Sequence, residues 1–195
     1  MRFDKIPEDT FKQIQLSAGI LVKNFTPTSG EVTDLIGATS GGITFEANPS
    51  FTDFGDDIDN CPKNTKELKK LESWEAKMSG TFVTVTPAIA KSLVAASDID
   101  EGDATHVIPR NDLLDTDFAD IWWVGDYSEF NGTKNGGFAA IHLINSLSTG
   151  GFKIQSEDKN KGKFSFEFTG HYSMAEISKV PFEVYIKAGT AEAAV

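Results

Sequence analysis

Apolar and polar residues alternate with a period of two along much of the chain, which is the pattern of β-strands with one buried face. The clearest run covers residues 163–172, in which Phe164, Phe166 and Phe168 share one face and polar side chains occupy the other. Runs with the same period predict further strands at residues 14–22, 42–47, 74–85 and 182–187.

Two segments, residues 121–124 and 138–144, are apolar on both faces and predict strands that are buried on both sides. One helix is predicted over residues 87–96, because Thr86 offers an N-cap hydroxyl and Pro87 suits the first helical position. We therefore expect a mostly β fold, a β-sandwich or open barrel with one flanking α-helix, as a single domain over residues 1–195.

The alternation breaks over residues 48–73, where we expect a long irregular loop. Long loops in compact domains are usually functional or disordered. This one has too many apolar residues for a free linker: Phe51, Phe54, Ile58, Leu68 and Leu71. Either it folds over its own core or it packs against another subunit, and both alternatives remain open.

The chain is acidic, with a formal net charge of −11 at pH 7. Ten acids and one base, Arg110, lie between Asp98 and Glu129, so most of the excess charge is in one stretch. Free binding to nucleic acid requires clustered Lys and Arg, and this distribution argues against it. The acidic stretch is either a solvated face or a surface that repels DNA or meets a basic partner.

The sequence offers little for catalysis or metal binding. His106, His142 and His171 lie on separate predicted strands, and the common nucleophile and phosphate-loop motifs are absent. Cys61 is the single cysteine, which excludes an internal disulfide or thiolate metal cluster. The acids Asp53, Asp56, Asp57 and Asp59 do not have EF-hand spacing. We expect no enzyme activity, no metal and no cofactor.

No apolar run approaches the ~20 residues that span a bilayer, so we expect no membrane contact. Residues 1–9 are polar and lack the apolar core of a signal peptide. The sequence therefore predicts a protein that is made in, and first occupies, a cytoplasm.

Residues 35–45, 51–60, 64–74 and 79–86 together resemble the tail tube (major tail) proteins of phages and prophages of Gram-positive bacteria. The resemblance is concentrated between about Leu35 and Asp103. It implies a β-sandwich, shared with the tube protein of type VI secretion systems, whose copies form hexameric rings stacked into a hollow tube. It also implies contact with other tail proteins, passage of DNA without specific binding, and a path from the host cytoplasm into the virion tail.

The resemblance implies two groups of functional residues. A tube wall needs strands with one packed face and one wet face, and the candidates for the lumen side are Glu75, Lys77, Ser79, Thr81, Lys163, Ser165, Glu167 and Thr169. The loop carries the candidates for contact between subunits: Phe51, Phe54, Asp56, Asp57, Ile58, Lys66, Lys69 and Lys70. The alternative is that all of these side chains face solvent on a monomer.

Two other functions remain open. One is a ligand-binding β-sandwich, such as a carbohydrate-binding module, that uses Trp74, Trp122 and Trp123. Because neighbouring residues of a strand point to opposite faces, Trp122 and Trp123 cannot both join one platform. The other is the tube protein of a phage-like contractile injection system.

Overall fold

The computed structural model describes residues 17–126 and 136–189, together with residues 7, 10, 14 and 15. Strands dominate the described chain, so the expected mostly β fold class is confirmed. The strands are β1 (Ile20–Thr26), β2 (Glu31–Leu35), β3 (Thr39–Asp53), β4 (Lys69–Phe82), β5 (Ser97–Ile99), β6 (Val107–Pro109), β7 (Ala119–Asp126), β8 (Phe138–Ser148), β9 (Lys153–Gln155), β10 (Lys163–Thr169) and β11 (Phe182–Lys187).

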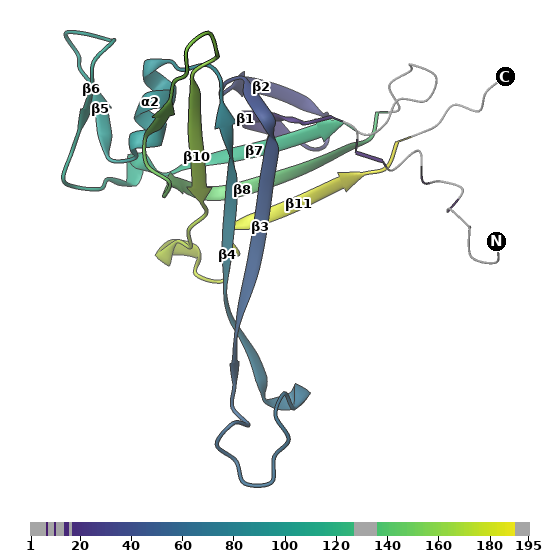
Figure 1. Cartoon of the computed structure of the whole chain (residues 1–195). Helices are drawn as coiled ribbons and strands as arrows, with labels where there is room; N and C mark the ends of the chain where they lie inside the picture. Colours follow the sequence, from purple (N-terminus) through teal and green to yellow (C-terminus); the bar gives the residue numbers. More distant parts are fainter. Residues whose placement is uncertain (1–6, 8–9, 11–13, 16, 127–135, 190–195) are drawn as a thin grey trace, which may run out of the picture.

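Nine of these strands form one antiparallel sheet with the order β2-β1-β7-β8-β10-β4-β3, to which β11 adds on β8 and β9 on β10. The strands β7, β8 and β11 run at a steep angle to β4 and β10, so the sheet folds into two layers (Figure 1). Strand β8 joins the layers, because it pairs with β7 and β11 along its length and with β10 at Leu147 and Ser148.

The main core lies between the two layers. Phe164, Phe166 and Phe168 of β10 are buried there, as their alternation predicts. The α-helix α2 (Pro87–Val94) adds Ile89 and Leu93, and Thr86 accepts a hydrogen bond from the Ile89 backbone N–H, as expected for an N-cap. The core residues from the other strands are Leu21, Ala76, Met78, Phe82, Ile121 and Leu143.

A second apolar cluster covers the other face of β7 and β8. Trp122 and Val124 of β7 pack there with Phe138 and Ala140 of β8, whereas Trp123 packs against the main core. The two tryptophans therefore point to opposite faces. The structure confirms that residues 121–124 and 138–144 lie in strands that are covered on both sides.

The predicted irregular loop at residues 48–73 is wrong in extent. Residues up to Asp53 continue β3 and residues from Lys69 begin β4, so that only residues 54–68 lie outside strands, with a short 3-10 turn at Lys66–Leu68. Residues 48–51 and 69–73 are exposed on both faces, so they lack an amphipathic period. Pro49 is tolerated because β3 is the edge of the sheet.

The β3–β4 hairpin extends far beyond the body of the molecule (Figure 1). We call residues 49–73 the arm and residues 54–68 the arm tip. The helix α2 and strands β1 and β2 lie at the opposite end of the molecule from the arm tip (Figure 1).

Other predicted boundaries shift by a few residues. The strand expected at residues 14–22 begins at Ile20, because Gly19 has a φ of +72° and lies where the Trp123 indole leaves no room for a Cβ. The helix ends at Val94 rather than at residue 96. Within the described residues, the structure has no helix that is both long and apolar enough to span a membrane.

Candidate assembly surfaces

The residues predicted to face a lumen lie on one face of β4 and β10. The strand register places Thr81 opposite Ser165, Ser79 opposite Glu167, and Lys77 opposite Thr169. Glu75 continues this face on β4, and Lys163 continues it on β10 beside Gln155 of β9. These eight residues therefore share one face of the two strands, with Lys163 and Glu75 at the two ends of the group.

Strand β3 adds residues that sequence reasoning missed. Its register places Thr44 opposite Ser79, Glu46 opposite Lys77, and Asn48 opposite Glu75. The alternation in residues 42–47 predicted the strand but not its neighbour in the sheet. We call the combined surface the polar face, formed by Thr44, Glu46, Asn48, Glu75, Lys77, Ser79, Thr81, Lys163, Ser165, Glu167 and Thr169.

The polar face and the core are the two sides of the same strands. On the opposite side of β4 and β10, Met78, Phe82 and Phe168 are at most 2% exposed. All the polar-face residues are exposed or half-buried. A sheet with one face buried in the core and the other exposed to solvent could form the wall of an aqueous channel.

Carboxylates and ammonium groups are balanced on the polar face. Lys77 Nζ lies 2.7 Å from Glu75 Oε1, and the hydrogen bond and charge of Glu75 raise the pKa of Lys77 above its ordinary value. Glu167 accepts a hydrogen bond of 3.0 Å from the Thr149 hydroxyl. Glu46 brings the number of carboxylates on this face to three. They are matched by Lys77, by Lys163 and by Lys153 of β9, which the register places opposite Ser165, so the face has no net positive charge to hold a polyanion.

The predicted subunit-contact residues all lie on the arm. Phe51, Phe54 and Ile58 are about half exposed, at 51%, 53% and 50%. Lys69 lies over the Phe51 ring, 5.2 Å from its centroid, and the register places Lys70 beside it, opposite Thr52. Asp56, Asp57 and Lys66 are exposed on the arm tip. The arm thus carries apolar side chains and charges of both signs outside the body of the molecule.

Hydrogen bonds hold the arm tip in a defined shape. The Asp53 carboxylate accepts from the backbone N–H of Gly55 at 2.9 Å and of Asn64 at 3.0 Å. The Phe54 N–H donates to the Leu68 carbonyl at 3.0 Å. The Asp53 carboxylate therefore stabilises the conformation of the arm tip. Across the described residues, no three His, Cys, Asp or Glu side chains are close enough to hold a metal ion.

Part of the acidic stretch is neutralised internally. Arg110 Nη2 donates to Asp117 Oδ1 at 2.6 Å, and its Nε and Nη1 lie 2.6 Å from Asp98 and 3.5 Å from Asp112. Asp100 and Asp103 are held in the β5–β6 turn, where the backbone N–H of Gly102 and the hydroxyl of Thr105 lower their pKa values. Asp100 also lies 3.5 Å from His106 Nδ1, so the carboxylates of this exposed turn are engaged within the turn itself.

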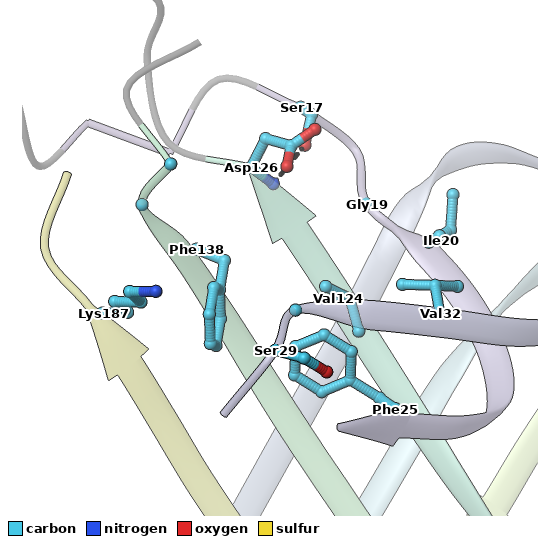
Figure 2. Close-up of a pocket in the computed structure, with 13 residues that line it drawn as sticks. Ser17, Gly19, Ile20, Phe25, Ser29, Val32, Val124, Asp126, Phe138 and Lys187 are labelled. Carbon is cyan, nitrogen blue, oxygen red and sulfur yellow. Dashed lines mark hydrogen bonds between the residues drawn. The ribbon is translucent and has the colours of Figure 1, made fainter. Parts of the chain in front are cut away.

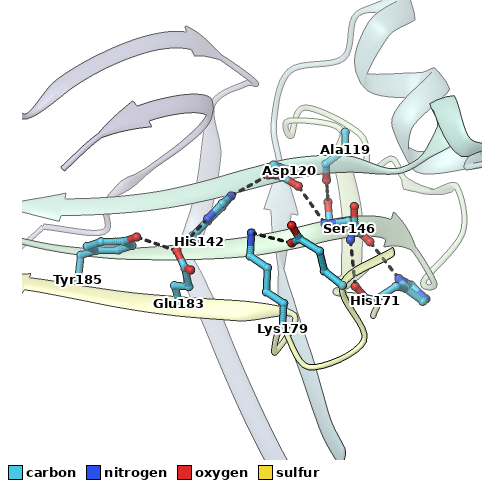
Figure 3. A network of polar contacts seen from close by, with 10 residues as sticks. Ala119, Asp120, His142, Ser146, His171, Lys179, Glu183 and Tyr185 are labelled. Atoms are coloured by element: carbon cyan, nitrogen blue, oxygen red, sulfur yellow. Dashed lines mark hydrogen bonds and ion pairs between the residues drawn. The ribbon is translucent and has the colours of Figure 1, made fainter. Parts of the chain in front are cut away.

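A polar network joins β7, β8 and β11 (Figure 3). His142 Nε2 lies 2.9 Å from Asp120 of β7, and Nδ1 lies 3.5 Å from Glu183 of β11. The Tyr185 hydroxyl donates to Glu183 at 2.7 Å, and this bond, followed by His142, lowers the pKa of Glu183 below its ordinary value. Both ring nitrogens of His142 thus have a partner, and the sequence did not indicate that these partners are acidic.

The three tryptophans are engaged in packing. Trp122 is 8% exposed and stacks on His142, Trp74 packs edge-on against Phe182, and Trp123 Nε1 donates to the Ala18 carbonyl at 3.0 Å. A cavity of about 580 Å³ between β1, β7 and β8 is lined by Phe25, Val124, Phe138 and Lys187, without a tryptophan (Figure 2). No exposed tryptophan platform for sugar stacking exists on the described residues.

Comparisons with known proteins identify no family. No protein-family model matches the chain, and no curated protein resembles it. Among solved structures, the chain is similar to a chain of a structure titled "Virion of native gene transfer agent (GTA) particle", with 7% identity and a TM-score of 0.42 over 88% of this chain and 96% of that one. A likeness this weak does not establish a shared function, which is therefore argued from the geometry of the chain.

Proposed function

We propose that this chain is a non-enzymatic structural subunit of a phage tail, whose copies form hexameric rings stacked into the tail tube. The observation that carries this proposal is the continuity of β3 and β4, which form part of a one-sided sheet in the body and then run on into the arm. One hairpin thus joins a wall segment to a contact element. The resemblance of residues 35–103 to tail tube proteins supports the same function.

In this proposal the polar face lines the lumen and the arm contacts a neighbouring copy. Ring closure and stacking both need heterologous contacts, in which unlike patches of one surface meet. The arm supplies a projecting patch with half-exposed Phe51, Phe54 and Ile58. DNA passes along a surface on which Glu46, Glu75 and Glu167 offset the lysines, so that no net positive charge holds the phosphates. Host synthesis in the cytoplasm and later incorporation into the virion, in contact with other tail proteins, follow from this role.

A tube protein of a contractile injection system would use the same geometry, and no residue described above separates the two. The carbohydrate-binding alternative loses its main support, because Trp74, Trp122 and Trp123 are all engaged in packing.

Shortening the arm tests the proposal. Phe51 pairs with Leu71, so an Asn-Gly turn can replace residues 52–70 and close the hairpin. The body should remain folded, because no residue of that segment belongs to either apolar cluster. Sedimentation velocity at rising concentration should show assemblies for the full chain and monomers for the variant.

A matched control shortens a different loop. Gln155 pairs with Lys163, so Asn-Gly can replace residues 156–162 in the same way. This variant should assemble as the full chain does. Assembly that persists without the arm, or that is lost equally in the control, would contradict the role of the arm.

A further inference from the structure

A groove with an apolar floor lies at the end of the molecule opposite to the arm tip. It has a volume of about 710 Å³ and lies between β2, α2 and the start of β7. Its floor is formed by Ile89, Ile121 and Phe168, which are at most 5% exposed, and Leu35 on its rim is 66% exposed. Leu35 therefore extends the apolar surface of the groove from its floor to its rim.

The polar groups of the groove are mostly satisfied inside the molecule. Asp117 binds Arg110, Asp120 binds His142 and the backbone N–H of Asn145, and Asp34 accepts a hydrogen bond of 2.8 Å from Asn24. Small-molecule sites instead present a few polar groups that converge on the ligand. The groove therefore suits a protein surface more than a small ligand.

The charges at the groove complement those of the arm tip. Lys23 and Lys91 lie at its rim, and Lys23 makes no ion pair within the described part of the chain. The arm tip presents exposed Asp56 and Asp57 next to the half-exposed Ile58. The β5–β6 hairpin packs beside α2, close to the groove, and its turn is acidic. This turn has the opposite charge to the basic residues of the arm, Lys66, Lys69 and Lys70.

We propose that the groove between β2, α2 and β7 receives the arm tip of a second copy of this chain, with Phe54 and Ile58 on its apolar floor and Asp57 near Lys23. This inference rests on the proposed function and names the surface that the arm contacts. The arm points away from its own groove (Figure 1), so the contact can form only between copies. A head-to-tail contact of this kind builds an open stack when the rotation between copies does not close it into a ring.

Charge exchange gives the first test. Lys23→Glu places two like charges together at the contact, and Asp57→Lys does the same from the other side. Each single variant should weaken self-association at least about tenfold at low salt, and the double variant should recover it, because the pair is restored with reversed sign. Circular dichroism checks that each variant is folded, which is expected since both side chains are exposed.

Cross-linking between different copies gives the second test. In a Cys61→Ser background, chains with Ile58→Cys are mixed with chains that carry Leu35→Cys, and oxidation should give a covalent heterodimer. A matched mixture replaces Leu35→Cys by Ser165→Cys, an exposed position on the polar face, and should give little product.

The outcomes separate this inference from the proposed function. Heterodimers from the groove mixture, with rescue in the double variant, support the contact. Assembly of the unaltered chain without either result would overturn the groove contact and leave the proposed function standing. If the unaltered chain does not associate at any concentration, both fall.

Discussion

The imidazole of His142 lies flat on the indole of Trp122, with ring centroids 3.9 Å apart and planes 5° from parallel. The stack fixes the imidazole between Asp120 on β7 and Glu183 on β11. One side chain of β8 therefore ties three neighbouring strands together on the face away from the main core (Figure 3).

Removing this imidazole should destabilise the body. His142→Ala deletes the stack and two polar contacts, and we expect a loss of about 1–2 kcal/mol in the free energy of unfolding, because both carboxylates are partly exposed. Urea unfolding measures this loss. His106→Ala, at an exposed turn, should change the free energy of unfolding by less than about 0.5 kcal/mol. Equal losses in the two variants would contradict the proposal that His142 links the three strands.

The same network predicts a dependence on pH. The pKa of Glu183 is lower in the folded chain than its ordinary value, so the charged form stabilises the fold. That contribution is fully present above the ordinary pKa of about 4.3 and is lost as the pH falls through the folded value. Glu183→Gln should therefore cost stability at pH 7 and progressively less below pH 4.

Glu176→Gln is the matched control for the pH series, because Glu176 is exposed and its carboxylate, among the described residues, pairs only with Lys179 at 3.7 Å. Its stability difference from the unaltered chain should be small at every pH. A Glu183→Gln difference that stays constant between pH 7 and pH 3 would show that ionisation of Glu183 does not support the fold.

The one-sided packing of β4 gives a third prediction. A Cβ on Gly80 would lie 2.7 Å from the Phe166 ring, inside the core. Gly80→Ala should destabilise the fold by about 1–3 kcal/mol through overpacking. The neighbouring change Ser79→Ala, on the polar face, should stay within about 0.5 kcal/mol. Thermal unfolding should therefore show a clearly lower melting temperature for Gly80→Ala than for Ser79→Ala.

The charge of the polar face gives a fourth prediction. Replacing Glu46, Glu75 and Glu167 by Lys should convert a charge-balanced surface into a basic one that binds DNA, with an affinity that falls steeply as salt rises. Fluorescence anisotropy with labelled duplex DNA measures the effect on assembled protein.

A control variant should change the net charge equally by replacing Glu31, Asp126 and Glu176 by Lys, because these residues are exposed outside the polar face. Its binding to DNA should remain weaker than that of the polar-face variant. Equal binding by the two variants would mean that DNA does not meet the polar face.

The sequence predicted the parts of the fold in which one face of an element is buried. Phe182–Lys187 and the helix after Thr86 formed nearly as expected, and the alternation around Phe166 identified both the core and the polar face. Burial of one face imposes a period on the sequence, and that period can be recognised without a structure.

The arm could not be predicted in this way, because its strands have solvent on both faces and so carry no period. Ser50 and Phe51 also flank a shift in register, and Pro49 is compatible with a strand only at an edge. Contacts between distant strands, such as His142 with Glu183, were missed because strand order is not encoded in any local pattern.

Electron microscopy of the concentrated, unaltered chain tests the central claim most directly, because it shows whether copies bind one another and in what arrangement. The account predicts sixfold rings and hollow stacks of such rings, with the arms between successive rings. Particles that remain single at millimolar concentration, or that associate without a central channel, would contradict it.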